Sequence, residues 1–221
     1  LVVEQVSGMP FARFLKRHIF VPAGMQNTVA FEEGISTVPH RAYGHSRDST
    51  GWRPTDQSNT SAVLGDGGVY TSVDDLVLWH LALERSTLVR PATQQLAWTP
   101  ATLANGAATT YGFGWFVDRD AHGLHLWHHG ETRGFTNAIV RYPDQRLMVA
   151  VLTNRAGGAP WDSVCARAAA LGSDLEACGR IIPLQDDSPD TALVARVRLL
   201  APDTGLHRGE HCPGLRAVPA A

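Results

Sequence analysis

The sequence is poor in cysteine, in net charge and in long apolar runs, and each shortage argues against a class of protein. Its three cysteines form no C-x-x-C pair, which argues against a structural zinc site and a dense disulfide framework. A formal net charge of −2 gives no electrostatic reason to expect nucleic acid or an anionic membrane as a partner. The longest apolar runs, 76–79 and 147–152, are too short for a membrane span. An apolar content of 44% nevertheless predicts a globular protein with a sizeable core.

Lysine is the scarcest basic residue, because only one of the 19 lysine and arginine residues, Lys16, is a lysine. The residue three positions before it is Arg13, so the sequence contains no S-x-x-K motif. None of the tyrosines has asparagine two positions later, so a Y-x-N motif is also missing. The chain by itself therefore has no serine that a lysine one helical turn later could activate as a nucleophile.

The first sixty residues combine two predicted helices with a long connection. A helix that begins near Val2 is predicted to end at Gly8, where glycine favours the left-handed cap conformation. Pro10 opens a second helix, whose apolar side chains follow the helical period as far as Ile19. Residues 21–60 are rich in proline, glycine and small polar residues, and they predict a surface connection with short elements.

The next segment is predicted to be helical again. A tight glycine turn at 65–68 precedes Ser72, which is predicted to cap a helix with Asp75 near its positive end. Pro91 is predicted to open a further short helix that runs through Trp98. Outside the long connection, helices therefore account for much of residues 1–98.

After residue 110 the helical period gives way to strict alternation. Four short segments predict an antiparallel meander, and they are Tyr111–Val117, Leu124–His129, Phe135–Tyr142 and Leu147–Thr153. Pro143 begins a tight turn between the last two, and Pro160 opens a final helix through Leu171. This order of elements predicts an α+β fold in which an antiparallel sheet packs with helices.

The composition changes again near residue 175. The remaining residues contain five prolines and one plausible short helix, at Leu193–Leu200. We therefore expect a domain boundary between residues 1–174 and residues 175–221. The second range is expected to be a poorly ordered tail or the remnant of an accessory domain.

Four segments, each weak by itself, together carry a resemblance to a known family. They are Val2–Gly8 with Phe20–Met25, Gly65–Leu76, Tyr111–Trp115 and Trp127–Asn154. In this order they resemble the class C β-lactamase-like serine hydrolases, which include penicillin-binding proteins, DD-peptidases and esterases. One departure is Ala23, which stands where the family usually has leucine.

The resemblance implies a β-lactamase/transpeptidase-like fold and a reaction through an acyl-enzyme formed on a serine. The implied substrate is a small molecule or peptide that presents an ester, amide or β-lactam carbonyl. The family needs no cofactor. The resemblance also implies a periplasmic or secreted location, and no signal region is visible in this sequence.

The segment His128-His129-Gly130 resembles the third active-site motif of that family, in its His-x-Gly form. By this resemblance His128 helps to hold the substrate and to tune proton transfer around the serine. Gly130 leaves room for a substrate along the strand, and the backbone N–H of Glu131 donates half of an oxyanion hole. Alternation places His129 on the opposite face, and Asn137 on the next strand is a further residue that could reach the substrate.

A metal site is a second interpretation of the same segment. His122, His125, His128 and His129 lie close together in the sequence, and imidazole is the commonest transition-metal ligand. Alternation places His125 and His129 on one face and His128 on the other, so one ion cannot readily bind all three. We therefore expect no metal.

Leu1 corresponds to a position a few residues after the family's Y-x-N motif. We therefore expect an N-terminally truncated chain, in which residues 1–174 are the C-terminal part of a β-lactamase-like domain. On this interpretation the missing N-terminal segment is a partner of the chain, and the chain alone is inactive. The alternative is a non-catalytic binding module or pseudoenzyme remnant of the same fold.

Overall fold

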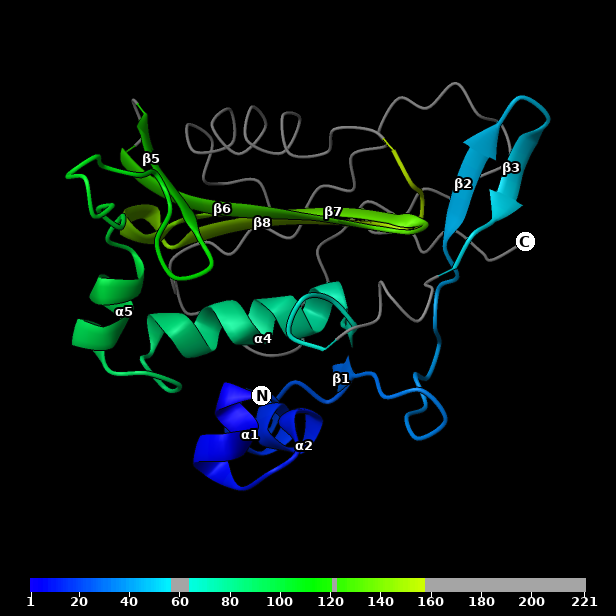
Figure 1. Cartoon of the computed structure of the whole chain (residues 1–221), viewed down its shortest axis with the longest axis horizontal. Helices are drawn as coiled ribbons and strands as arrows, with labels where there is room; N and C mark the ends of the chain where they lie inside the picture. Colours follow the sequence, from blue (N-terminus) through cyan, green and yellow to red (C-terminus); the bar gives the residue numbers. More distant parts are fainter. Residues whose placement is uncertain (57–63, 121–122, 158–221) are drawn as a thin grey trace, which may run out of the picture.

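A computed structural model describes residues 1–56, 64–120 and 123–157 (Figure 1). The predicted helix at 160–171, the tail from 175, the three cysteines and His122 lie outside these residues. None of the helices in the described ranges has both the length and the apolar composition that crossing a membrane requires.

Helices form two groups along the described chain. The first group contains α1 (Val2–Ser7), α2 (Phe11–Leu15), the π-helical η1 (Lys16–Phe20) and α3 (Val21–Ala23). The second group contains α4 (Val73–Glu84) and α5 (Pro91–Ala97). Gly8 and Gly24 follow α1 and α3 with φ angles of 65° and 77°, the left-handed conformation that glycine adopts without steric cost. The cap predicted at Gly8 is confirmed, whereas the second helical stretch continues past Ile19.

Helix α4 begins at the predicted cap. The Ser72 hydroxyl accepts a hydrogen bond from the Asp75 N–H at 3.1 Å. Asp75 is almost completely buried, and its carboxylate accepts from the Asn27 N–H at 2.8 Å and from the Thr28 hydroxyl at 2.6 Å. Because Asn27 and Thr28 follow α3, this carboxylate joins the N-terminal helices to α4.

The central sheet is antiparallel, with four strands in the order β5-β6-β7-β8. The strands are β5 (Phe116–Asp120), β6 (Gly123–Thr132), β7 (Phe135–Tyr142) and β8 (Leu147–Thr153). Helix α4 lies along one face of the sheet (Figure 1), where Val77 packs with Met148 and Ala150. The predicted α+β class, with helices packed on an antiparallel sheet, is confirmed.

Three of the four predicted strands are present with bounds close to those expected, but the first prediction, Tyr111–Val117, is wrong over its first five residues. The chain enters β5 only at Phe116, and the residues from Tyr111 to Trp115 form a loop. Gly114 has a φ of 76°, which interrupts an extended backbone. The turn predicted at Pro143 is confirmed, because η2 (Pro143–Gln145) joins β7 to β8.

A β-hairpin lies beyond the end of this sheet (Figure 1). It consists of β2 (His45–Asp48) and β3 (Gly51–Pro54), and the chain around it also contributes the short pair β1 (Val29–Ala30) and β4 (Val69–Tyr70). The His45 N–H donates to the Asn154 carbonyl at 2.9 Å, and the Ala156 N–H donates to the His45 carbonyl at 2.7 Å. The predicted connection with short elements is therefore present, and it is anchored to the chain that leaves β8.

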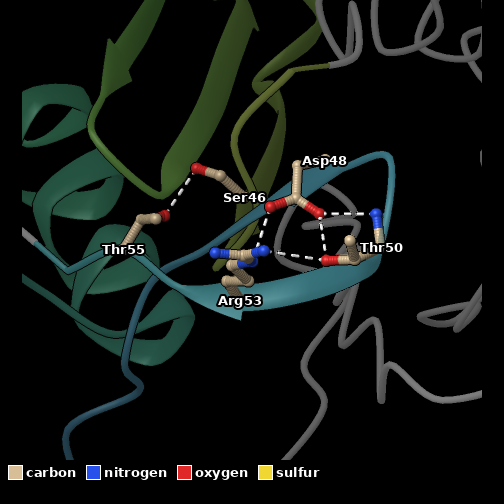
Figure 2. Close-up of polar contacts among 5 residues, drawn as sticks. All are labelled: Ser46, Asp48, Thr50, Arg53 and Thr55. Carbon is tan, nitrogen blue, oxygen red and sulfur yellow. Dashed lines mark hydrogen bonds and ion pairs between the residues drawn. The ribbon is translucent and has the colours of Figure 1, made fainter.

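The tip of this hairpin is held by polar contacts around one carboxylate (Figure 2). Asp48 accepts from the N–H of Thr50 at 2.7 Å and from its hydroxyl at 2.6 Å, and it pairs with Arg53. The Thr50 hydroxyl contributes most to lowering the pKa of Asp48 below its usual value. At the open end of the hairpin, the Ser46 and Thr55 hydroxyls form a hydrogen bond.

A buried polar cluster lies between α4 and β7. The Arg141 side chain has no exposed surface, and its guanidinium donates to His80 Nδ1 at 3.0 Å and pairs with Glu84 at 2.6 Å. Burial, and then the Arg141 charge, lower the pKa of His80 from 6.5 to about 4. At neutral pH, His80 is therefore a neutral acceptor for the arginine, and the cluster ties the sheet to α4.

Candidate substrate-binding edge

Strand β6 is paired along its whole C-terminal half on one side but not on the other. Strand β7 accompanies it as far as Thr132, whereas β5 reaches only Trp127. Within the described residues, no strand pairs with 128–132 on the β5 side. The predicted site residues His128, Gly130 and Glu131 therefore lie together on an edge to which an extended ligand could bind.

The two adjacent histidines lie on opposite faces of the sheet, as alternation predicted. His128 stands opposite Ile139, which packs with the core facing α4. His129 stands opposite Ala138, and its ring lies parallel to that of Phe116 with centroids 6.1 Å apart. The register thus directs the two side chains from opposite faces of the strand, but both rings contact Phe116 and their centroids lie 6.0 Å apart.

Both ring nitrogens of His128 have hydrogen-bond partners. Nε2 lies 2.9 Å from the Tyr111 hydroxyl, and Nδ1 lies 2.6 Å from the backbone carbonyl of His129. Tyr111 and Phe116 also contact the His128 ring, with centroids 5.8 and 5.4 Å away. The sequence did not identify Tyr111 as a site residue, because alternation placed it in a strand. The glycines that follow it, in Tyr-Gly-Phe-Gly-Trp, were the available signal of a loop.

Gly130 leaves open space on the edge. A Cβ atom built there meets no other heavy atom within 4 Å, and Gly130 is not among the glycines with positive φ. Asn137 stands opposite it on β7, and its side-chain oxygen accepts from the Thr153 N–H at 3.1 Å. That bond fixes the orientation of the Asn137 amide, with its oxygen turned toward Thr153. Glu131 is exposed and stands opposite Thr136.

The turn between β6 and β7 closes this edge at one end. A Cβ atom on Gly134 would lie 2.4 Å from the Thr55 carbonyl oxygen and 2.8 Å from Gly44, so both the segment preceding the hairpin and the residue that follows it pack directly on the turn. That segment also contains Arg41, which forms an ion pair with Asp56 and lies over the ring of Tyr70 at 4.8 Å. The candidate edge therefore ends where the β6–β7 turn packs against Gly44 and Thr55.

The histidines of this region are not gathered around one point. The ring of His125 lies against Tyr142 with centroids 5.3 Å apart, and that of His129 stacks with Trp127 at 5.9 Å. In the part of the chain that the structure describes, no three histidine, cysteine or acidic side chains are grouped so that they could hold a metal ion.

Residues 1–174 match the family described as Beta-lactamase. The chain belongs to this family. The resemblance drawn from the four sequence segments is thereby confirmed.

Two curated relatives illustrate the range of the beta-lactamase family. Penicillin-binding protein 4* of Bacillus subtilis is 29% identical over 211 residues, which cover 89% of this chain and 47% of that protein. The D-aminopeptidase of Gluconobacter oxydans is 28% identical over 219 residues, which cover 96% of this chain and 39% of that protein. The chain thus spans less than half the length of these relatives.

Solved structures share the fold. The octameric penicillin-binding protein homologue from Pyrococcus abyssi superposes with a TM-score of 0.64 at 26% identity, over 77% of this chain and 39% of that one. A D-amino acid amidase from Ochrobactrum anthropi superposes with a TM-score of 0.60 at 19% identity, over 80% of this chain and 54% of that one. These likenesses confirm the predicted β-lactamase/transpeptidase-like fold.

Proposed function

We propose that this chain provides the substrate-binding edge of a serine hydrolase that works through an acyl-enzyme. The observation that carries the proposal is the open space at Gly130. Neither packing among the described residues nor a positive φ requires glycine at this position. A substrate lying along the edge supplies the missing reason, because any side chain at residue 130 would occupy its place.

The edge residues then have distinct tasks. An extended substrate hydrogen-bonds to the unpaired edge of β6, beside the imidazole of His128, which holds its polar group or exchanges a proton with it. The N–H of Glu131 donates to the carbonyl oxygen as negative charge develops there. The serine oxygen attacks the carbonyl carbon, the leaving group departs with a proton, and water then releases the acid from the serine ester. This sequence contains no S-x-x-K motif, so the proposal requires a serine and a lysine supplied by residues that it does not include.

The bond that is broken is an amide, an ester or a β-lactam. Similarity to the D-aminopeptidase of Gluconobacter oxydans favours an amide, and similarity to penicillin-binding protein 4* is compatible with a β-lactam. Because an added strand makes main-chain hydrogen bonds, peptide-like amides also suit the geometry of the edge best.

A non-catalytic binding module of the same fold is the second candidate, and the absence of an S-x-x-K motif favours it. The gene sequence upstream of Leu1 distinguishes the two candidates. A serine hydrolase requires S-x-x-K and then Y-x-N upstream of Leu1 in the same open reading frame. A frame that stops before those motifs would favour the binding module.

Kinetics of paired variants test the proposal in the protein that joins this chain to those motifs. We expect His128→Ala to lower kcat/KM for acyl substrates about 10- to 1000-fold, the range for losing a positioned proton-transfer or oxyanion partner. His129→Ala is the matched control on the other face, and we expect a far smaller effect. Equal effects of the two substitutions would contradict the assignment.

The 221-residue chain alone gives a complementary measurement. We expect no hydrolysis of nitrocefin or p-nitrophenyl esters above background, because losing a nucleophile unit removes roughly 10⁶-fold of rate. A fluorophosphonate probe should likewise label none of its serines. Labelling of a single serine would show that the chain carries a nucleophile of its own.

A further inference from the structure

Tyr111 has a defined place beside the candidate edge. Its hydroxyl lies 2.9 Å from Nε2 of His128, and its ring meets Phe116 edge-on with centroids 4.9 Å apart. The residue also forms a β-bridge with Phe116, the first residue of β5. Tyr111 therefore lies at the end of β5, where the pairing of β6 stops.

The loop that carries Tyr111 is held from two sides. A Cβ atom on Gly112 would lie 2.3 Å from the Ala97 carbonyl oxygen, so the backbone there rests directly on the end of α5. The Gly112 N–H donates to the Trp115 carbonyl at 2.8 Å, and the buried Trp115 ring stacks on Trp79 of α4 at 5.7 Å. Because both helices fix the loop, the position of the Tyr111 hydroxyl is set by the fold.

The two partners of His128 also determine which nitrogen carries the proton. A backbone carbonyl can only accept, so the 2.6 Å contact between Nδ1 and the His129 oxygen requires a hydrogen on Nδ1. In the neutral ring, Nε2 then holds a lone pair, and the Tyr111 hydroxyl donates to it. Together the two bonds fix the plane of the ring as well as its tautomer.

We propose that Tyr111 is a positioning residue of this site, which holds His128 as the Nδ1–H tautomer with Nε2 as the acceptor beside the edge. Its importance for catalysis rests on the function proposed above. The geometry itself does not, and it can be measured in the chain without any turnover. Tyr111 thus adds a residue from the loop before β5 to the three that β6 supplies.

Nitrogen NMR of the chain labelled with ¹⁵N-histidine tests this proposal, since protonated and unprotonated ring nitrogens have well-separated shifts. The spectra are recorded at about pH 8.5, above the ordinary histidine pKa of about 6.5. The signals of His128 are assigned by their loss in His128→Gln. We expect a protonated Nδ1 and an unprotonated Nε2. A wild-type ring protonated on Nε2 would overturn the proposal without any variant.

Tyr111→Phe removes the hydroxyl and keeps the ring contact with Phe116. We expect the Nε2 signal of His128 to shift toward that of a protonated nitrogen, because the ring can then turn and populate the other tautomer. The signals of the buried His80 report within the same sample that the fold is intact. Tyr43→Phe, an exposed tyrosine on the segment preceding the hairpin, is the matched control and should leave His128 unchanged. Identical His128 signals in wild type and Tyr111→Phe would overturn the proposal. Failure of the proposed function would instead appear as inactivity of the protein that joins this chain to S-x-x-K and Y-x-N, with these signals as expected.

Discussion

His80 on α4 and His128 on β6 have surroundings that differ completely. His80 is 1% exposed, accepts from the Arg141 guanidinium, and has a hydrogen bond with the backbone of Arg146. His128 is half-buried and is held by Tyr111 and by the carbonyl of its own neighbour. The His80 ring is buried and hydrogen-bonded within the core, whereas the His128 ring lies beside an unpaired strand edge.

Under the proposed function, the same side chain serves stability in one place and ligand binding in the other. Around His80, the buried Arg141 charge is paired with Glu84 and bonded to the His80 ring, so removing one of these groups leaves an uncompensated group in the core. Around His128, the hydrogen bonds fix the ring but leave the neighbouring edge open. We therefore expect substitutions in the first cluster to change the free energy of unfolding, and those in the second to change binding and catalysis.

The largest expected effect on stability comes from Arg141→Ala. Removing one partner of a buried ion pair costs about 3–5 kcal/mol, because Glu84 and His80 then lose the group that satisfies them. Urea unfolding followed by circular dichroism measures the change. His128→Ala is the control and should cost less than about 1 kcal/mol, since its ring is half-exposed. Similar losses for the two variants would remove the distinction between the clusters.

Acid should destabilise the protein through His80. Its folded pKa of about 4 lies below the unfolded value of 6.5, so the unfolded chain binds a proton more readily. The contribution of the neutral ring is therefore fully present above pH 6.5, declines as the pH falls from 6.5, and is lost at about pH 4. The shift corresponds to about 3 kcal/mol. His80→Gln should flatten the pH dependence between pH 6.5 and 4.5, whereas an unchanged slope would place its origin in other groups.

Local signals in the sequence predicted the parts of the fold that neighbours along the chain determine. Gly8 and Ser72 cap helices because of their own backbone and hydroxyl chemistry, and alternation located β6, β7 and β8. The same alternation was misleading at Tyr111, where the contact of Gly112 with α5 keeps the chain in a loop. Alternation carries no information about such a contact.

Contacts between distant parts of the chain could not be predicted in this way. Arg141 and His80 are 61 residues apart, and nothing in either local segment names the other as its partner. The candidate edge was found because its His-x-Gly spacing resembles a known motif. That β5 pairs with β6 no further than Trp127, and so leaves the edge open, became visible only from the strand register.

Two glycines at the end of β6 give the smallest effect and the sharpest separation of fold from function. Gly134 has a φ of 81°, and an added Cβ would lie 2.4 Å from the Thr55 carbonyl oxygen. We expect Gly134→Ala to cost at least about 2 kcal/mol, through left-handed strain and displacement of that backbone. Gly130→Ala has open space and ordinary strand geometry, so it should leave the stability unchanged or raise it by up to about 1 kcal/mol. Thermal unfolding of the two variants measures this contrast. A destabilised Gly130→Ala would mean that the fold itself requires this glycine, and the proposed substrate edge would lose the observation on which it rests.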